Sequence, residues 1–476
     1  MKQRIFRSRQ AQAERGTYVL YWMQQAQRVV HNPALNYACN EAAQRRQPLL
    51  IAFVLVSDIP EATNAHYRFM LEGIIEVAKA MRAHGLDFRI YNGNPVSIVS
   101  ALATEASLTV LDHGYLKWQR AWRDQLFDIL EHSSIVEIDT EAVVPVHIAS
   151  DKEEYSAATL RNKLLKILPD HLSFEKFELP SLGFADTKLM DEHRFPGDST
   201  DRSQILDFCG HALDLSLHGN HQIFRGGYRA AIHKLRDFKE HKLPGYSAYR
   251  SHPDLDFQSD LSPYLHFGQI SPLEIIDEVK DVEDGYALRT LLTQRKKLTG
   301  TEVNLADFLE ELIVRRELGM NFCYYNDDYD SFACLPTWAK ATLLNHLQDT
   351  RDRQYGLSDL ENAATDDPYW NAAQKQMMNT GKMHNYMRMY WGKRVIAWFD
   401  SVEEAYEVLV YLNNKFSLDG RDANSYAGVA WCFGKHDRPW AERDIYGMVR
   451  YMNANGLKRK FDMKVYLQKV ESGVVR

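Results

Sequence analysis

Short apolar runs alternate with a helical pattern over the first third of the chain, and no other feature restricts the fold as strongly. The runs TYVLYWM, LLIAFVLV, DFRIYNG, LTVLDH and SIVEID are nearly continuous in apolar residues and rich in β-branched ones. Such runs are typical of strands buried on both faces of a sheet. Between them, HYRFMLEGIIEVAKAMRAHG has helical spacing and ends on Gly85, a residue suited to a helix C-cap. The alternation predicts a doubly wound, Rossmann-like α/β domain with a parallel sheet.

The strand signals fade after about Gly219, and helical patterns dominate the second half of the chain. Helical spacing runs through ADFLEELIVRRELGMNF, through the whole of residues 370–399 and through VEEAYEVLVYLNNKF. Between the halves, DEHRFPGDSTDRSQ is polar and broken by proline and glycine, which favours a linker. A chain of 476 residues exceeds what one core usually serves. We therefore expect an α/β domain over residues 15–170, a linker over 171–218 and a mainly α-helical domain over 219–476.

Several classes of protein are excluded by what the sequence lacks. Neither G-x-G-x-x-G nor G-x-x-x-x-G-K-[ST] occurs, so a standard dinucleotide or P-loop site is not supported. The 5 cysteines form no C-x-x-C pair, so neither a disulfide framework nor a metal site is indicated. The first 16 residues are polar and basic, which excludes a secretory signal and leaves a transit peptide open. No apolar run approaches a membrane span, so we expect no membrane contact and a cytoplasmic protein, or a nuclear one in a eukaryote.

The net charge of −7 argues against a uniformly basic nucleic-acid binder, but the charge is unevenly distributed. Residues 431–476 contain ten Lys or Arg against five Asp or Glu. A local basic surface on an acidic protein fits the binding of a nucleic-acid strand at one face. An ordinary solvated helix face is the alternative.

Tryptophan is concentrated near the C-terminus and interleaved with arginine. The tryptophans are Trp370, Trp391, Trp398, Trp431 and Trp440, and the arginines are Arg388, Arg394, Arg421, Arg438 and Arg443. Rings beside guanidinium groups suit stacking on a base or a flavin and pairing with phosphate. Trp391 and Trp398 are seven residues apart, so on a helix they share a face at about 10 Å, a workable step for electron hopping. Three core tryptophans that pack a helical bundle are the alternative.

Three further segments offer suitable side chains, each with a plain structural alternative. Asn413 precedes an LDG turn, and its amide can donate and accept; Arg388 could pair with Asp419 nearby. A helix C-terminus followed by an ordinary turn is the alternative. Serine hydroxyls precede a Ser-Pro helix start that suits phosphate but is also an ordinary N-cap. Glu311 and Arg315 are four residues apart, which on a surface helix is a weak ion pair.

Taken together, these segments resemble the class II cyclobutane pyrimidine dimer photolyases, the flavin-dependent DNA repair enzymes driven by blue light. The resemblance is carried by WNAAQKQMMNTGKMHNYMRMYW, YLNNKFSLDGRDANSY, AGVAWC and HDRPWAER, by YSAYRSHPDLDFQSDLSPYLHFGQIS, and by YWMQQAQRVVHNPALNYA near the N-terminus. It covers about residues 17–466. The chain departs from the pattern at CFGK before His436, which is one residue shorter than in the family.

The resemblance implies FAD, active when fully reduced, and UV-damaged DNA containing pyrimidine dimers as the partner of a monomeric enzyme. Excited FAD would pass an electron to the dimer, the ring would open and the electron would return. An antenna chromophore, a deazaflavin or a folate, could occupy the α/β domain.

The resemblance also assigns roles to residues. Those matching flavin contacts are Tyr246, Ser259, Leu261, Ser262, Arg388, Asn413, Asp419 and Asp422. Those matching contacts to DNA or the lesion are Arg250, Glu311, Met389, Trp431, Arg438, Trp440, Arg450, Lys458 and Arg459. The catalytic set is Glu311, Asn413 and the electron relay of Trp391, Trp370 and Trp398, with Trp391 nearest the flavin.

Three rival interpretations remain. A cryptochrome-like photoreceptor would be expected to carry a long polar tail, whereas this chain ends at Arg476 soon after its last helical pattern. A (6-4) photolyase would need histidines beside the lesion, and His266 and His384 are available. A non-photochemical helical DNA-binding protein with a structural tryptophan cluster is the third, and it would be colourless.

Overall fold

A six-stranded sheet with the strand order β1-β6-β5-β2-β3-β4 forms the first part of the computed structural model. The structure describes residues 2–11, 16–172, 177–196, 201–210, 224–280 and 285–473. The strands are Ile5–Arg9 (β1), Tyr18–Met23 (β2), Leu49–Leu55 (β3), Asp87–Asn92 (β4), Ala106–Asp112 (β5) and Ile135–Ile138 (β6). All neighbouring pairs run parallel except β1 and β6. The predicted parallel α/β domain and its five buried strands are therefore confirmed.

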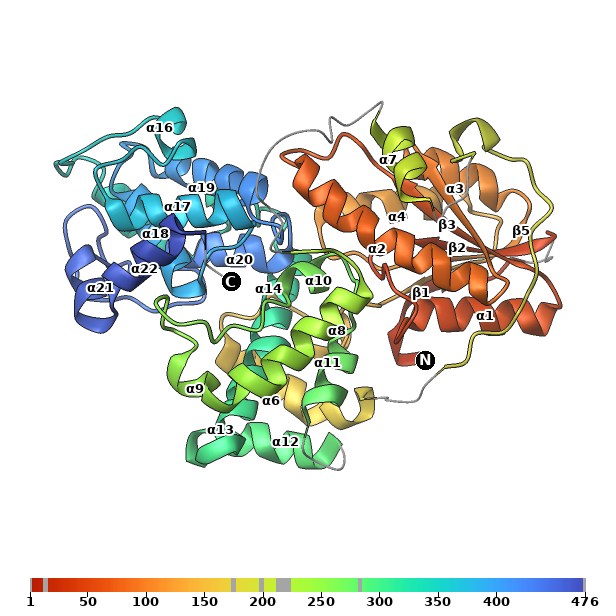
Figure 1. Ribbon diagram of the computed structural model, residues 1–476, viewed down its shortest axis with the longest axis horizontal. Coiled ribbons are helices and arrows are strands. Elements are labelled where there is room, and N and C mark those ends of the chain that lie inside the picture. Colours follow the sequence, from red (N-terminus) through yellow and green to blue (C-terminus); the bar gives the residue numbers. More distant parts are fainter. Residues whose placement is uncertain are drawn as a thin grey trace.

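Helices cover both faces of this sheet (Figure 1). They are Pro33–Arg45 (α1), Asn64–Ala83 (α2), Pro95–Ala103 (α3) and Lys117–Ile129 (α4). Along β2, Val19, Tyr21 and Met23 join the hydrophobic cluster of α1 and α2. Leu20 and Trp22 join the cluster of α3 and α4 on the opposite face. This alternation buries the strand on both sides, which explains its continuous apolar sequence. We call the sheet with α1–α4 the α/β lobe.

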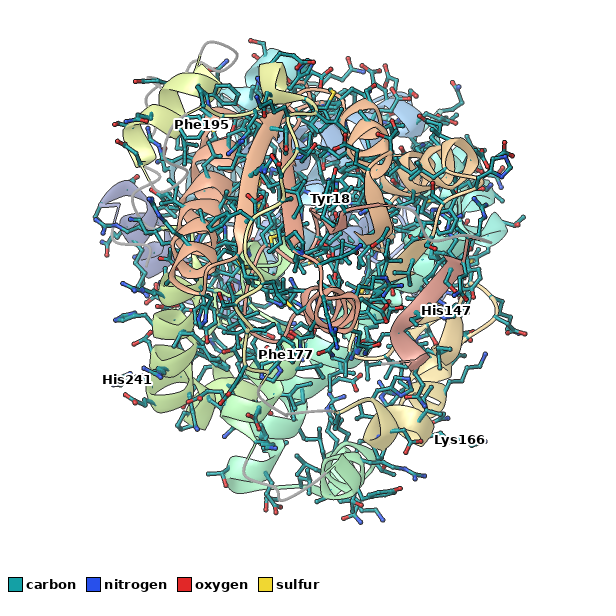
Figure 2. All side chains as sticks on the ribbon, turned by 90° about the vertical axis from the view of Figure 1, so that its right-hand side faces the viewer. Tyr18, His147, Lys166, Phe177, Phe195 and His241 are labelled. Carbon is teal, nitrogen blue, oxygen red and sulfur yellow. The ribbon has the colours of Figure 1, made fainter. Side chains whose placement is uncertain are left out.

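Strand β1 was not predicted from the sequence. Its residues IFRSR pair antiparallel with β6, at the edge of the sheet, and are only partly buried. Phe6 of β1 stacks on His113 with ring centroids 4.0 Å apart and meets the ring of His147 edge to face at 4.9 Å. Figure 2 labels His147 on this side of the molecule. A half-exposed edge strand needs few apolar residues, so it leaves little signal in the hydrophobic pattern.

Most of the remaining helices form a helical lobe around two hydrophobic clusters. They are Val146–Ala149 (α5), Ala157–Ile167 (α6), Tyr228–Asp237 (α8), Tyr246–Tyr249 (α9), Ser262–His266 (α10), Pro272–Val279 (α11), Gly285–Gln294 (α12), Gly300–Leu309 (α13), Arg316–Tyr325 (α14), Thr337–Asn345 (α15), Leu357–Glu361 (α16), Pro368–Thr380 (α17), Asn385–Ile396 (α18), Val402–Phe416 (α19), Ala423–Cys432 (α20), Ala454–Lys460 (α21) and Met463–Glu471 (α22). Helix Arg202–Gly210 (α7) packs instead against the α/β lobe. Phe238–Lys242 and Glu310–Arg315 are π-helical. Short 3₁₀ turns are Lys2–Arg4, Leu168–His171, Asp191–His193, Leu243–Gly245, Arg295–Lys297 and Phe332–Cys334.

The chain crosses between the lobes more than once. Helices α5 and α6, which precede the predicted boundary at residue 170, belong to the core of the helical lobe. Residues 177–196 then return along β4, where Arg89 donates to the carbonyls of Ala185 and Thr187, and α7 follows beside α2. This return covers the edge strand β4 and protects it from pairing with another chain. Parts of the predicted linker 171–218 lie outside the described residues, and the domain boundaries stay a prediction.

Residues 370–399, predicted as continuously helical, form two helices. Helix α17 ends at Thr380, and Gly381 adopts a left-handed conformation with φ of 72°. Helix α18 begins at Asn385, where the ring of His384 accepts a hydrogen bond from the backbone of Tyr386. The left-handed residue stops the α-helical hydrogen bonding, so the chain turns here and α18 packs against α17.

The two lobes are in direct backbone contact. Arg28 of the α/β lobe is buried and donates to the carbonyl of Thr140, just after β6, at 2.7 Å. It also donates to the carbonyl of Gly268 in the helical lobe, at 3.0 Å. Gly268 has φ of 61°, and a Cβ there would lie 1.7 Å from the carbonyl oxygen of Gln25. Only glycine permits this close approach of the two backbones, so Gly268 allows the helical lobe to pack directly against the loop that contains Gln25.

The carboxyl group of Glu317 is buried at the start of α14, against the segment that leaves the sheet. Its Oε1 accepts from the backbone N–H groups of Val143 and Val144, at 2.6 and 3.2 Å. Burial raises the pKa of Glu317 to about 8. The folded protein thus holds a proton that the unfolded chain, with a carboxyl of ordinary pKa near 4.5, has lost. This group therefore favours folding at acidic pH, and stability declines between the two pKa values by about 1.4 kcal/mol per pH unit.

We expect Glu317→Gln to be more stable than the wild type at pH 8 by on the order of 2 kcal/mol, and nearly equal to it at pH 5. Urea unfolding at both pH values measures the difference. An equal shift of the midpoint at pH 5 and pH 8 would contradict the assigned protonation.

Candidate functional site

The side chain of Arg388 connects α18 with α19 and, through Asn413, with α20. From α18 it donates to Oδ1 of Asn413 on α19 and, at 3.3 Å, to Oγ of Ser417. Its Nη2 lies 3.6 Å from Oδ1 of Asp419. Nδ2 of Asn413 donates in turn to Oγ of Ser425 on α20, at 2.7 Å. The predicted residues Arg388, Asn413 and Asp419 thus form one network, and two serines that the sequence gave no reason to select hold it together.

Two carboxylates flank this network in the ionised form. Burial alone would raise the pKa of Asp419, but Arg388 and hydrogen bonds from serine hydroxyls, including that of Ser262, bring it below its ordinary value. Burial opposes the charge of Asp422 as well, and the imidazole of His266, 3.4 Å away, lowers its pKa. Asp422 also caps the N-terminus of α20. These carboxylates can accept hydrogen bonds from ligand N–H or hydroxyl groups.

The serine segment before α10 approaches the same network. Ser262 is exposed at the first position of α10 and interacts with Asp419. Ser259 is half-buried, whereas Leu261 is buried in the same hydrophobic cluster as Tyr246. The predicted residues of this segment therefore supply two accessible hydroxyl groups and an apolar support.

Three lysines converge on Asp260, within the serine segment. Lys382 contacts Oδ1 of Asp260, and Lys242 and Lys234 lie 3.4 and 3.8 Å from Oδ2. Burial lowers the pKa of Lys382 to about 7. Sequence reasoning missed this cluster, although KMHNYMR places Lys382 just before the helix that carries Arg388. Converging ammonium groups beside serine hydroxyls suit an anion such as a diphosphate.

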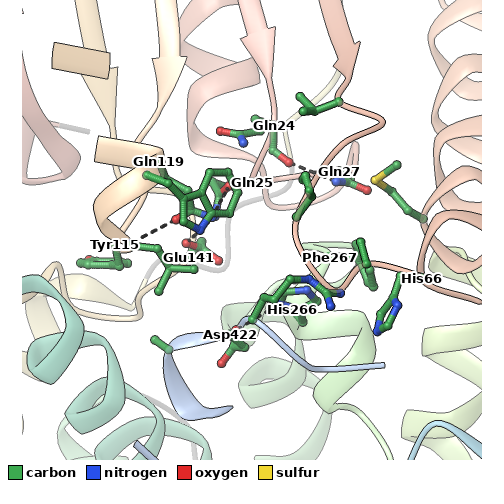
Figure 3. A pocket seen from close by; sticks show the side chains of 18 of the residues that line it. Gln24, Gln25, Gln27, His66, Tyr115, Gln119, Glu141, His266, Phe267 and Asp422 are labelled. Atoms are coloured by element: carbon green, nitrogen blue, oxygen red, sulfur yellow. Dashed lines mark hydrogen bonds and ion pairs between the residues drawn. The ribbon is translucent and has the colours of Figure 1, made fainter. Parts of the chain in front are cut away.

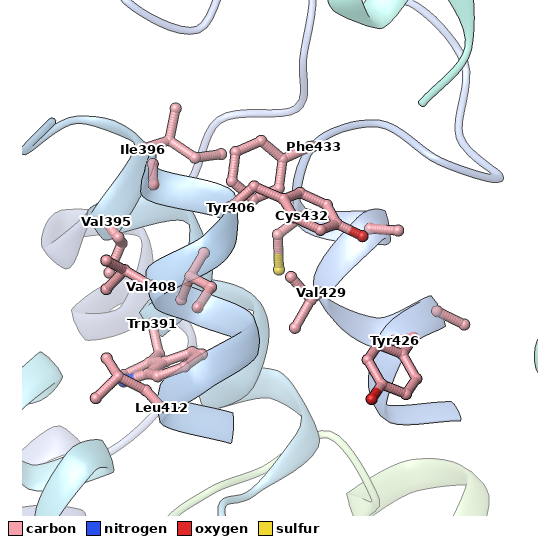
Figure 4. Packing of buried hydrophobic residues seen from close by; sticks show 14 of the residues in the cluster. Trp391, Val395, Ile396, Tyr406, Val408, Leu412, Tyr426, Val429, Cys432 and Phe433 are labelled. Carbon is pink, nitrogen blue, oxygen red and sulfur yellow. The ribbon is translucent and has the colours of Figure 1, made fainter. Parts of the chain in front are cut away.

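The three predicted relay tryptophans are in contact and buried. The rings of Trp370 and Trp391 are stacked, with centroids 6.2 Å apart, and Trp370 meets Trp398 edge to face at 5.2 Å. Nε1 of Trp370 donates to the carbonyl of Trp391, and Figure 4 shows Trp391 in the same buried cluster as Val408 and Leu412 of α19. The spatial order is therefore Trp391, Trp370, Trp398. The expected direct step from Trp391 to Trp398 along one helix face is corrected, because α18 ends at Ile396 and Trp398 lies in the turn beyond it.

Glu311 lies in a π-helical segment and does not pair with Arg315 as helical spacing predicted. Its Oε1 accepts from Nη1 of Arg250 at 2.7 Å. Arg315 instead approaches Glu310 at 3.7 Å and lies over the ring of Trp431, 5.2 Å from its centre. The π-helix widens the turn and so changes which residues are neighbours, a feature often found at functional sites. Arg250 also lies over the ring of Tyr246, at 5.7 Å, which links this pair to a residue predicted to contact the flavin.

The predicted DNA-facing residues lie on a partly exposed rim. Arg438 and Arg450 lie on the ring of Trp440, at 5.5 and 5.2 Å, and this indole is 41% exposed. Met389 and Trp431 are half-buried. No contact that the structure describes joins the remaining two predicted residues to Trp440. These are Lys458 and Arg459, exposed at the C-terminal end of α21.

Two cavities lie between the lobes, at the carboxyl edge of the sheet. The first, of about 110 Å³, is lined from the α/β lobe by glutamines that include Gln25 and Gln27, and from the helical lobe by His266 and Asp422 (Figure 3). Burial raises the pKa of Glu141 on its wall to about 7. The second, of about 710 Å³, is lined by the loops after β3 and β4. Ligands of open α/β sheets bind at this edge.

The residues of the helical lobe fit FAD. The lysines around Asp260 with Ser259 and Ser262 would hold the diphosphate, and the network of Arg388 and Asn413 offers donors and acceptors to a heteroaromatic ring. On α20, a Cβ added at Gly428 would meet no atom within 4 Å, so this helix face borders open space. Among the described residues no group of His, Cys, Asp and Glu could hold a metal ion, and no described helix is long and apolar enough to cross a membrane.

The amino-acid sequence is similar to those of known DNA photolyases. The DNA photolyase family model matches residues 19–181. A deoxyribodipyrimidine photo-lyase of Methanothermobacter thermautotrophicus is 42% identical over 456 residues, which are 96% of this chain and 95% of that protein. The deoxyribodipyrimidine photo-lyase of Potorous tridactylus is 36% identical over 95% of this chain and 81% of its own length.

Solved structures share the fold at low sequence identity. A class III photolyase of Agrobacterium tumefaciens superimposes with a TM-score of 0.70 at 17% identity, covering 97% of this chain and 87% of that one. A Synechocystis cryptochrome gives 0.70 at 14% identity, covering 96% and 89%. These likenesses establish the arrangement of the two lobes.

Proposed function

This chain belongs to the family of deoxyribodipyrimidine photo-lyases, and we propose that it is a class II enzyme that splits cyclobutane pyrimidine dimers under blue light. DNA repair by a photolyase follows from the family; the class, the lesion and the electron path are the proposed part. The main support for the proposal is that Arg388 and Trp391 lie on the same turn of α18. On it, Arg388 joins the network of Asn413 and Asp419, and Trp391 begins the chain of indoles.

Bound FAD, fully reduced and excited by light, would supply the electron that opens the cyclobutane ring and would take it back afterwards. The protein supplies placement and electrostatics. Asn413 can donate and accept beside a ring that changes protonation, because its amide carries both functions. Asp419, ionised beside Arg388, keeps the local charge balanced.

Glu311 and Trp431 would contact the dimer outside the duplex. A dimer pairs poorly, so extruding it costs less than extruding a normal base. The half-buried indole of Trp431, supported by Arg315, offers a face for stacking. Arg250 holds the carboxyl group of Glu311 in the free protein, and in its neutral form this group would donate a hydrogen bond to a dimer carbonyl oxygen that gains charge as the ring opens.

The indoles would carry an electron inward from Trp398 through Trp370 to Trp391. Each neighbouring pair of rings is in contact, so no step crosses a gap. The relay would return the flavin to its reduced state and would not take part in ring opening itself.

Of the two histidines that a (6-4) photolyase could use, His384 has a structural role here. Burial lowers the pKa of His384 to about 3, and its ring caps α18, so it stays neutral and cannot act as an acid. His266 pairs with Asp422. This arrangement favours repair of the cyclobutane dimer over the (6-4) lesion.

The cavity lined by Gln25, Gln27 and Glu141 supports the proposal of an antenna chromophore. Its amide and carboxyl groups come from loops at the carboxyl edge of the sheet, and Oε1 of Gln27 is buried without a partner among the described residues. A deazaflavin or a folate would satisfy such groups with its amide-like edges, and the adjoining cavity of about 710 Å³, which shares Trp118 and Arg421 with the first, offers the room that its flat ring system needs.

Repair of UV-irradiated oligothymidine tests the proposed function. We expect the protein, loaded with FAD and chemically reduced, to restore the thymine absorbance under blue light and not in the dark. Failure of the reduced, flavin-containing protein to restore it in light would reject dimer repair. The third rival, a colourless DNA-binding protein, is rejected if the purified protein carries a flavin spectrum.

A further inference from the structure

Residues 434–440 follow α20 and form a loop, here called the α20 loop, with a fixed base that starts at the buried residues Gly434 and Lys435 and a tip that is exposed. Nζ of Lys435 donates to the carbonyl of Cys334 at 2.7 Å and forms an ion pair with Glu153. Nδ1 of His436 lies 2.9 Å from the carbonyl oxygen of Tyr155. Because a carbonyl oxygen can only accept, this nitrogen donates the hydrogen bond. The hydroxyl of Tyr155 donates to the carbonyl of Asp437 at 2.7 Å. Three successive loop residues are therefore held, two of them by Tyr155.

The tip of the loop is more exposed, and it is anchored at its far end, where the backbone N–H of Trp440 donates to the carbonyl of Met448 at 2.8 Å. Arg438, Pro439 and Trp440 are exposed. Within the tip, the side chain of Asp437 accepts from the backbone of Arg438 and from Nε1 of Trp440, so the indole keeps a defined orientation relative to the base. Arg450 lies on the Trp440 ring, 5.2 Å from its centre. An exposed indole between two guanidinium groups suits contact with bases and phosphates.

The segment that holds the base, residues 150–155, is itself rigid. Nδ2 of Asn321 on α14 donates to the carbonyl of Lys152, and its Oδ1 accepts from the backbone of Glu154 at 2.7 Å. The hydroxyl of Tyr325 donates to the carbonyl of Ser150 at 2.5 Å. Asn326 donates to the second carboxylate oxygen of Glu153 at 2.9 Å. Helix α14 continues directly from the π-helix that contains Glu311. One continuous helical element therefore supports both the base of the α20 loop and Glu311, the residue proposed to contact the dimer.

We propose that Tyr155, assisted by Glu153, is a positioning residue that makes this enzyme prefer lesions in duplex DNA over lesions in single strands. The inference rests on the proposed function and extends it to the form of the substrate. In a duplex, the extruded dimer and the surrounding strands have a fixed relation, so Trp440 must stand at a fixed place relative to Glu311. A single strand adapts its backbone to the protein and places no such demand on the loop. Ordering the loop in advance lowers the entropic cost of binding the rigid partner.

The inference predicts a selective defect in Tyr155→Phe, which removes only the hydroxyl group. We expect about three- to tenfold weaker affinity for a duplex oligonucleotide with one thymine dimer, the value of a single lost hydrogen bond. Affinity for the same dimer in a single strand, and its repair under light, should stay unchanged. Fluorescence anisotropy with both probes measures this, and the flavin spectrum checks folding. Tyr286→Phe, at an exposed tyrosine on α12, is the matched control.

A double-mutant cycle separates positioning from general stability. If Tyr155 acts through the loop tip, Tyr155→Phe should cost nothing further in a Trp440→Ala background. Glu153→Gln should show the same duplex-specific loss. Unchanged duplex affinity in Tyr155→Phe, an equal loss on single strands, or an undiminished effect in the Trp440→Ala background would each overturn the inference. The proposed function is judged separately, by whether the wild type binds and repairs the dimer at all.

Discussion

Replacing Trp391 with phenylalanine is expected to abolish the light-driven reduction of bound oxidised flavin. Phenylalanine keeps the apolar packing but is far harder to oxidise than an indole, so the relay loses the member next to the Arg388 network. The rate of flavin photoreduction should fall by more than roughly a hundredfold. This is nearly the effect expected from removing all three tryptophans, because the effects of residues that act as one unit do not add. Bleaching of the flavin absorbance under blue light, with an external electron donor present, measures it.

The other two tryptophans and the repair reaction supply the controls. Trp370→Phe should be as severe, since Trp370 lies between the other two rings, and the double variant with Trp391→Phe should be no worse. Protein reduced chemically beforehand should still repair dimers in both variants. Normal photoreduction in Trp391→Phe, or equal loss of repair after chemical reduction, would contradict a relay at this place.

Replacing Glu311 with alanine is expected to slow ring opening on the order of a hundredfold, the usual effect of removing one donor to charge that develops in a reaction. DNA affinity should change much less, because the loop tip and its arginines provide separate contacts. Single-turnover repair after a light flash, together with a binding titration, separates the two quantities.

Two further variants identify what Glu311 contributes. Glu311→Gln retains a donor and should keep more activity than Glu311→Ala. Arg250→Ala removes the partner that holds the carboxylate in the free protein, and it should affect affinity more than ring opening. If Glu311→Ala lowered binding and ring opening to the same extent, its role would be structural.

Elements with a strong local pattern were predictable from the sequence. Five of the six strands of the α/β lobe match the apolar runs, and α19 matches VEEAYEVLVYLNNKF from end to end. Strand β1 was missed because an edge strand with one face exposed needs few apolar residues. The break between α17 and α18 was missed because apolar spacing continues across it, whereas Gly381 alone ends the helix.

The residue types of the candidate site were also visible, but their partners were not. Glu311 pairs with Arg250, 61 residues away, because the π-helix turns it away from Arg315. Lys382 reaches Asp260 across 122 residues, and Tyr155 reaches Asp437 across 282. Such contacts depend on how distant segments meet, and no short-range periodicity encodes them.

By itself, the sequence determined that a parallel sheet precedes a helical lobe, and it marked the tryptophans, Arg388, Asn413 and Glu311 as a flavin and lesion site by family resemblance. Only the tertiary structure decided that Trp370 stands between Trp391 and Trp398, that Glu311 pairs with Arg250, and that the α20 loop is held by Tyr155. The physical reason is the distance along the sequence between the residues that interact. Strands and helices follow from side-chain periodicity over a few residues, whereas the site follows from the packing of two lobes whose chain crosses between them.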